Sequence, residues 1–144
     1  MKSYFLDLRI GSIHYKSPEE VSKSKPFVIF LHGADPISQN TEFWKPLFEI
    51  ILKYCNPIFM DRFGHGLSKK GKIDHITLDD HIESIKSLID HVKNKYSINE
   101  VVLLGRSLGG YLVLEIIKRY PEEISGIGLI APANSKMHID TITH

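Results

Sequence analysis

The feature that most constrains the fold is a regular alternation of short apolar runs with helix-like stretches. Four runs of mostly apolar residues occur, at residues 27–31, 57–60, 101–104 and 124–131. Three stretches with helical spacing of apolar residues separate them, at residues 41–54, 77–95 and 108–120. Continuous apolar runs are typical of strands that are covered on both faces. The alternation therefore predicts an α/β fold with a mostly parallel sheet and helices on both faces.

The N-terminal residues follow a different pattern. Residues 4–10 and 13–16 alternate apolar and polar side chains, with Gly11-Ser12 between them. Alternating runs on both sides of a glycine predict an antiparallel β-hairpin with its tight turn at Gly11-Ser12.

Two of the predicted helices begin with suitable capping residues. Thr77 with Asp80 resembles a capping box, in which each side chain bonds the other residue's backbone N–H. Asn40 or Thr41 is suited to cap the helix at residues 41–54. Residues 61–72 are rich in glycine and predict a loop.

Composition limits the possible classes of protein. The 144 residues fit a single domain, residues 1–144, and their net charge of +1 gives no strong attraction to nucleic acid or anionic lipid. Charge interrupts the N-terminus too early for a signal peptide. No apolar run approaches the roughly 20 residues of a membrane helix. We expect a soluble, cytoplasmic protein that does not bind nucleic acid or membranes.

The histidines and the lone cysteine do not suggest a metal site. Eight histidines occur, but without an H-x-x-x-H or H-E-x-x-H pattern. His81 and His91 lie on different faces of one predicted helix. Solvated surface histidines are the favoured interpretation, and Cys55 is predicted to be a small buried hydrophobic residue.

The sequence Gly105-Arg106-Ser107-Leu108-Gly109-Gly110 separates a predicted buried strand from a predicted central helix. A serine on such a sharp turn has its hydroxyl exposed at the carboxyl edge of the sheet, next to a helix N-terminus that favours negative charge. Gly105 and Gly109 give the small residues that the turn needs, and Gly110 allows close helix packing. The alternative is a glycine-rich turn with an idle serine. The pattern G-x-G-x-x-A at residues 126–131 lies within a strand, so a dinucleotide loop is rejected.

Four segments together resemble the α/β-hydrolase family, in the family's order and at similar spacing. They are Leu31-His32-Gly33, the loop Asp61-Arg62-Phe63-Gly64-His65-Gly66-Leu67-Ser68, the turn at residues 105–110, and Leu129-Ile130-Ala131-Pro132-Ala133. The chain looks most similar to small esterase-like and C–C-bond hydrolases. The resemblance implies the fold of that family, with about six of its eight strands.

The resemblance also implies a chemistry and the residues that perform it. Ser107 would be the nucleophile that forms an acyl-enzyme with a small ester-like substrate. The backbone N–H groups of Ala34 and Leu108 would form the oxyanion hole. The family's reaction needs no metal or organic cofactor, so none is expected.

Other conspicuous residues are interpreted as structural. His32, His65 and Asp61 are expected to shape their loops rather than to catalyse. Trp44 and Phe43 are expected in the core. Arg106 either contacts substrate or covers the start of the helix, and both interpretations stay open.

The residues after Ser107 leave little room for the acid and the histidine base that normally follow it. Asp140 with His138 or His144 is a disfavoured substitute, because a short tail gives them no scaffold. We therefore expect a C-terminally incomplete fold with an open sheet edge at residues 124–131, exposed apolar surface and little or no turnover. Such an edge favours self-association or a complementing chain. The alternative function is a catalytically silent binding module of the same fold that needs a partner.

Overall fold

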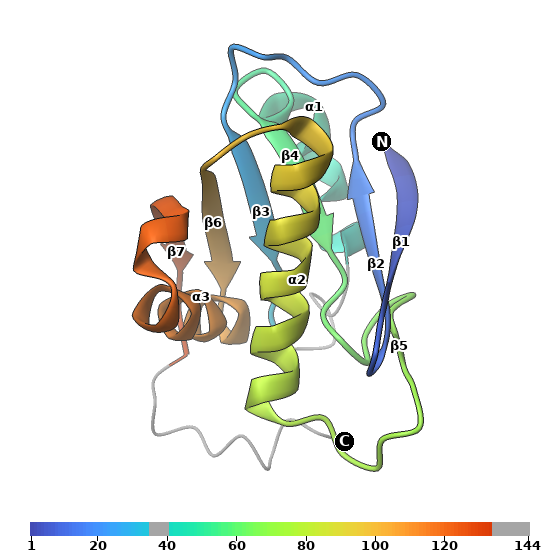
Figure 1. Cartoon of the computed structure of the whole chain (residues 1–144). Coiled ribbons are helices and arrows are strands. Elements are labelled where there is room, and N and C mark those ends of the chain that lie inside the picture. Colours follow the sequence, from blue (N-terminus) through green and yellow to red (C-terminus); the bar gives the residue numbers. More distant parts are fainter. Residues whose placement is uncertain (35–40, 134–144) are drawn as a thin grey trace.

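The computed structural model describes residues 1–34 and 41–133 and contains one twisted sheet (Figure 1). Its spatial order is β1-β2-β4-β3-β6-β7, with the short β5 paired to β2. The strands are β1 Lys2–Leu8, β2 Gly11–Ser17, β3 Phe27–Leu31, β4 Asn56–Met60, β5 Lys69–Lys70, β6 Val101–Arg106 and β7 Ile124–Ile130.

The four predicted buried strands are parallel neighbours. Strand β3 lies between β4 and β6, and β7 pairs with the outer side of β6. The hairpin β1–β2 is antiparallel, and β2 joins it to β4 in the antiparallel sense. The predicted fold class is therefore confirmed: a mostly parallel sheet preceded by an N-terminal hairpin.

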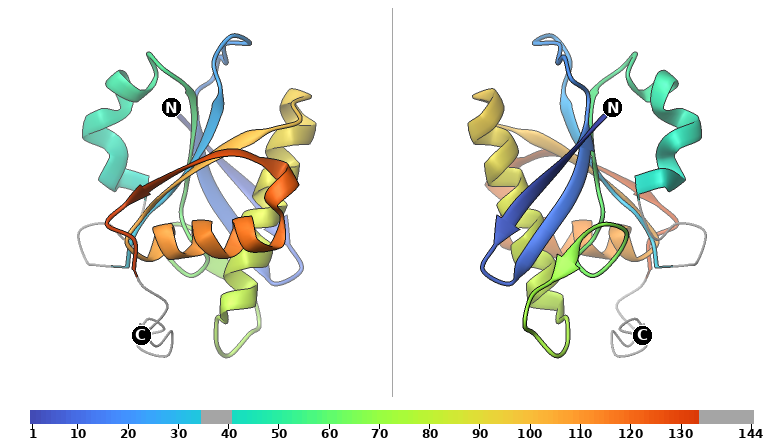
Figure 2. Two further views of the ribbon diagram at one scale, coloured as in Figure 1. Left: turned by 90° about the vertical axis from the view of Figure 1, so that its left-hand side faces the viewer. Right: turned by 90° about the vertical axis from the view of Figure 1, so that its right-hand side faces the viewer.

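Helices cover both faces of the sheet (Figure 2). On one face lie η1 (Thr41–Leu47) and α1 (Phe48–Ile51), and their core contains Trp44 and Phe59. On the other face lie α2 (Leu78–Tyr96) and α3 (Leu108–Arg119), and their larger core contains residues such as Ile85 and Val113. The short η2 (Pro121–Glu123) then leads into β7.

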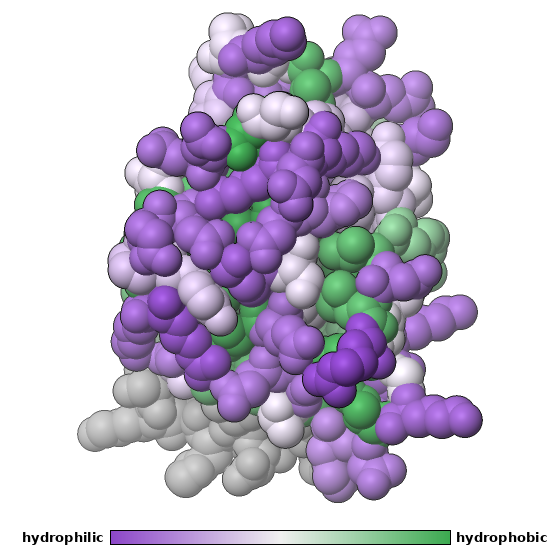
Figure 3. Space-filling view, in the orientation of Figure 1, coloured by the Kyte–Doolittle hydropathy of each residue, from purple (hydrophilic) through white to green (hydrophobic). Residues whose placement is uncertain are grey.

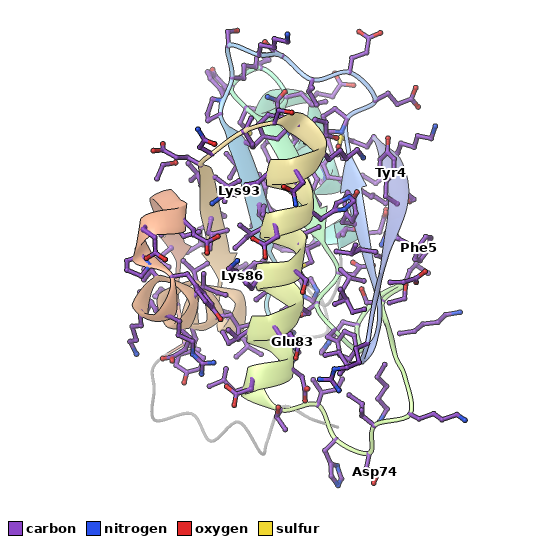
Figure 4. All side chains as sticks on the ribbon, viewed as in Figure 1. Tyr4, Phe5, Asp74, Glu83, Lys86 and Lys93 are labelled. Atoms are coloured by element: carbon purple, nitrogen blue, oxygen red, sulfur yellow. The ribbon has the colours of Figure 1, made fainter. Side chains whose placement is uncertain are left out.

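Helix α2 begins with the capping box that the sequence predicts. Thr77 and Asp80 form a reciprocal capping box, and Ser97 ends the helix in the left-handed conformation. Lys86 and Lys93 point toward the α3 and β7 side of the helix (Figure 4) and form ion pairs with Glu123 at 3.1 and 3.4 Å. The outward surface over α2 is mostly hydrophilic (Figure 3), as expected for a helix with one buried stripe.

Three local predictions are wrong. The predicted loop at residues 61–72 contains the short strand β5, because Lys69 and Lys70 pair with the start of β2. Residues 41–54 do not form one α-helix: a 3₁₀ segment, η1, precedes the single turn α1, because Pro46 has no N–H for a helical hydrogen bond. Asn40 lies outside the described residues. The hairpin turn is at Arg9-Ile10 rather than at Gly11-Ser12, since Leu8 pairs with Gly11.

Strand β7 is the last strand of the sheet among the described residues, and its outer edge has no strand beside it. The side chains of Ile127, Leu129 and Ile130 are 40%, 39% and 44% exposed. An uncovered apolar edge of this kind is prone to pair with another chain.

The prediction of solvated surface histidines is wrong for three of them. His14, His32 and His81 are 1%, 0% and 7% exposed. A structural role was expected for His32 alone of these three; His14 and His81 could not be expected to be buried, because segments distant in the sequence cover them.

Candidate active site

Ser107 lies at the junction between β6 and α3, in the context that the sequence predicts. Its φ of 52° and ψ of −118° place it in a region that disfavours residues with a side chain. The turn is held by hydrogen bonds to the end of β7: Ser107 N donates to Ile130 O, and Ala133 N donates to Ser107 O, both at 2.9 Å. The backbone is therefore fixed in a strained conformation on both sides of the serine.

The glycines around Ser107 are required by close backbone contacts. A Cβ at Gly105 would overlap the backbone of Gly109. A Cβ at Gly109 would overlap the backbone oxygen of Leu31 and lie 2.7 Å from that of His32. At Gly110 it would lie 2.9 Å from the Cβ of Pro132. No side chain fits at these three positions without a backbone shift.

The same contacts bring the turn after β3 to the start of α3. Leu31 is paired with Gly105 in the parallel ladder, so the residues that follow each of them lie at the same edge of the sheet. Ala34 follows His32-Gly33 there, and Leu108 follows Ser107. The two backbone N–H groups proposed for the oxyanion hole thus come from adjacent strand ends.

His32 is a structural histidine with both ring nitrogens engaged. Its Nε2 accepts from the backbone N–H of Arg62 at 2.9 Å, so its Nδ1 carries the proton and donates to Gly33 O at 2.7 Å. Burial, with a smaller contribution from the Arg62 charge, lowers the pKa of His32 to about 3. A neutral ring that is already bonded at both nitrogens does not serve as a proton acceptor for Ser107.

Arg62 is fully buried and binds the same turn. Its Nε donates to His32 O at 3.1 Å, and its Nη2 donates to Gly33 O at 2.9 Å. Nη2 also lies 3.4 Å from Nε2 of His65. Burial lowers the pKa of Arg62 to about 10, which leaves the guanidinium charged at neutral pH.

Asp61 ties the hairpin to the loop after β4. Its carboxylate accepts from His14 Nδ1 at 2.7 Å and from the backbone N–H groups of Thr41 and Leu67 at 2.6 and 2.8 Å. Burial by itself would raise the pKa of Asp61, but these hydrogen bonds lower it. The hydroxyl of Ser68 donates to Asp61 O. The contacts agree with the shaping role that the sequence suggests for this loop.

The two aromatic residues of η1 differ in their burial and contacts. Trp44 is buried in the core, as predicted, whereas Phe43 is half-buried. The Arg106 guanidinium lies 4.8 Å from the ring centre of Phe43. Arg106 therefore covers this part of η1, and its contact with a substrate stays a prediction. Cys55 is buried as expected, and burial raises its pKa to about 11.

Within residues 1–34 and 41–133, the Ser107 side chain forms no hydrogen bond to a histidine. His138, Asp140 and His144 lie outside the described residues. In the same described part of the chain, no three His, Cys, Asp or Glu side chains gather as metal ligands would. No helix found there has the length and apolar character to span a bilayer.

Arg62 is the residue of this site that the sequence did not single out. In the sequence, Arg62 is only one residue of the loop at residues 61–68. The parallel pairing of Leu31 with Met60 places the residues after β3 beside those after β4, and this brings Arg62 to His32-Gly33. A charged residue two positions after a buried strand, beside a second strand end, was the available signal.

Comparison with known proteins gives a consistent family. A model of the serine aminopeptidase, S33, family matches residues 22–141. Putative esterase/lipase 2 of Mycoplasma genitalium is 31% identical over 113 residues, 78% of this chain and 40% of that protein. Bovine monoacylglycerol lipase ABHD6 is 24% identical over 117 residues, 81% of this chain and 33% of that protein.

Solved structures support the same fold. Naproxen esterase from Bacillus subtilis superposes with a TM-score of 0.77 at 21% identity, covering 97% of this chain and 47% of that one. The chain thus spans a third to less than half of the length of these relatives. With a family model that matches most of its length, this chain belongs to the serine aminopeptidase S33 family of α/β-hydrolases.

Proposed function

We propose that this chain carries the nucleophile and the oxyanion hole of an esterase-like serine hydrolase. The observation that carries the proposal is Ser107 itself, held at a φ of 52° between β6 and α3. Strained backbone at a half-buried polar residue in a turn is typical of functional sites. The names of the relatives, an esterase/lipase and a monoacylglycerol lipase, support an ester as substrate.

In the proposed reaction, Ser107 Oγ attacks the ester carbonyl carbon and its proton passes to a base. The carbonyl oxygen becomes an oxyanion that the N–H groups of Ala34 and Leu108 stabilise. The partial positive charge at the start of α3 acts in the same direction. The intermediate expels the alcohol, which takes up a proton, and water then hydrolyses the acyl-enzyme. No step uses a metal or an organic cofactor.

We expect slow chemistry from the described residues by themselves. None of their histidines is bonded to Ser107, so they provide no general base. Enzymes that lose a triad member keep a residual acceleration of about 10³–10⁴ over water, from the oxyanion hole and binding. Hydroxide can then take the place of the base, and the rate should rise with pH.

The test is labelling of the 144-residue chain by a fluorophosphonate from about pH 7 to about pH 10, followed by intact mass. The proposal predicts slow addition of one label, increasing with pH and absent from Ser107→Ala. Equal labelling of both proteins contradicts Ser107 as nucleophile. Fast labelling near pH 7 contradicts the absence of a base.

A catalytically silent binding module is the second candidate, and it is favoured by the finding that no histidine within residues 1–34 and 41–133 is bonded to Ser107. It predicts no Ser107-dependent label at any pH in the same experiment. For either function we propose that the β7 edge self-associates or accepts a complementing chain, because Ile127, Leu129 and Ile130 are exposed there. A monodisperse monomer in sedimentation that binds no hydrophobic dye contradicts this part.

A further inference from the structure

The Gly33–Ala34 peptide is held through its carbonyl oxygen by two side chains. Arg62 Nη2 donates to Gly33 O at 2.9 Å, and His32 Nδ1 donates to the same oxygen at 2.7 Å. The carbonyl of Gly33 and the N–H of Ala34 belong to one planar peptide unit. The described residues contain no cis peptide bond, so the two groups point in opposite directions. Fixing the carbonyl therefore fixes the direction of the Ala34 N–H.

The two hydrogen bonds also change the strength of that N–H as a donor. Donors on a carbonyl oxygen polarise the peptide, and the effect passes along the chain of hydrogen bonds. Arg62 contributes a full positive charge at this oxygen, and it does so at 0% exposure, where charges interact strongly. The Ala34 N–H is thus expected to be a better donor than an ordinary backbone amide.

The burial of Arg62 is itself costly unless its charge is compensated. Among the described residues, no carboxylate forms an ion pair with it; the neighbouring Asp61 is engaged by His14, Thr41 and Leu67. Arg62 instead binds two backbone oxygens, of His32 and Gly33. The buried Arg62 guanidinium would therefore stabilise negative charge that develops next to the turn.

We propose that Arg62 is a positioning residue that orients and polarises the Gly33–Ala34 peptide as a donor to the oxyanion formed at Ser107. The proposal rests on the proposed function, since it assigns a partner to one of its two oxyanion donors. His32 holds the same oxygen from within the turn, and its Nε2 is fixed in turn by the Arg62 backbone N–H. Side chain and main chain of Arg62 therefore act on one peptide.

The experiment compares the wild-type chain with Arg62→Met, Arg62→Lys and the control Val92→Ala. Val92 is fully buried on α2 and makes no hydrogen bond to the turn, so its truncation reports a general loss of stability. Two quantities are measured for each protein. One is the rate of Ser107-dependent fluorophosphonate labelling at high pH, and the other is the carbonyl ¹³C chemical shift of Gly33.

For Arg62→Met we expect labelling slower by about ten-fold or more, given that losing a whole oxyanion donor costs about 10²–10³ in rate. The Gly33 carbonyl should shift upfield as it loses a donor. The labelling rate of Arg62→Lys should lie between those of the wild type and Arg62→Met. The lysine ammonium keeps the positive charge but lacks the planar guanidinium that donates from two nitrogens at once. If Arg62→Met does not fold, the lysine variant carries the comparison.

Labelling of the folded Arg62 variants at the rate of Val92→Ala overturns the proposal, and so does an unchanged Gly33 shift. A wild-type chain without Ser107-dependent label contradicts the proposed function separately. In that case the Gly33 shift alone still decides whether Arg62 polarises this peptide.

Discussion

Acid should destabilise this protein well above the pH at which its carboxylates protonate. Burial, followed by the charge of Arg62, lowers the pKa of both His32 and His81 to about 3. Unfolding returns each ring to its ordinary pKa of about 6.5. Above about pH 6.5 both states are neutral and the histidines have no effect. Below it the unfolded state takes up protons that the folded state does not, so stability falls with pH until about pH 3.

The size of the effect follows from the same values. A pH of about 5 is about 1.5 units below the pKa of a histidine in the unfolded state. Proton uptake by the unfolded state then favours unfolding by about 2 kcal/mol per histidine. His32 and His81 together should remove about 4 kcal/mol between about pH 7.5 and pH 5. That loss is a large part of the roughly 5–15 kcal/mol of a typical domain.

Urea unfolding at several pH values, followed by the fluorescence of Trp44, measures this loss. Trp44 is the single tryptophan and is buried. His81→Leu should halve the loss and leave stability near pH 7 almost unchanged, because Nδ1 of His81 has no hydrogen-bond partner among the described residues. The exposed His75, replaced by Gln, is the control. A loss below about 1 kcal/mol, or one that His81→Leu does not alter, refutes the reasoning.

Three further substitutions test the site and its support. Ser107→Gly should raise the free energy of unfolding by about 1 kcal/mol in urea, because glycine relieves the positive φ, whereas Ser107→Ala should not. Gly109→Ala should lower it by about 2–3 kcal/mol through backbone overlap, while Gly126→Ala, which meets only ordinary contacts, should be neutral or better in the same urea titration. Asp61→Asn should cost about 3 kcal/mol, since an amide N–H2 would replace the carboxylate oxygen that accepts from His14 Nδ1 and the Leu67 N–H; a loss below about 1 kcal/mol contradicts that importance.

The central parallel strands could be predicted because their residues are apolar almost without interruption. Residues 27–31 and 56–60 are fully buried between two helix layers, which is what such runs indicate. Helix α2 could be predicted to its first residue, since its capping box is local in sequence. The wide apolar face of residues 41–54 favours a single α-helix. Pro46 instead gives the first part of this segment 3₁₀ geometry, and the apolar pattern does not indicate that.

The serine turn could be predicted because its sequence pattern is also local, with glycines on both sides of a serine between a strand and a helix. The need for glycine has a local cause at position 105, where a Cβ would overlap the backbone of Gly109, and a distant one at position 109, where it would overlap Leu31. The anchoring of His32-Gly33 by Arg62 could not be predicted, because the contact spans about thirty residues and depends on the register of β3 with β4. The burial of His14 could not be predicted for the same reason: its ring is bonded to Asp61, which is 47 residues away.

The most direct test of the central claim is a crystal structure of the chain after labelling with a fluorophosphonate. We expect phosphorus bonded to Ser107 Oγ, with one phosphoryl oxygen within hydrogen-bond distance, about 2.7–3.1 Å, of the backbone nitrogens of both Ala34 and Leu108. A label on another residue contradicts Ser107 as the nucleophile. A label on Ser107 whose phosphoryl oxygen points away from both nitrogens contradicts the oxyanion hole.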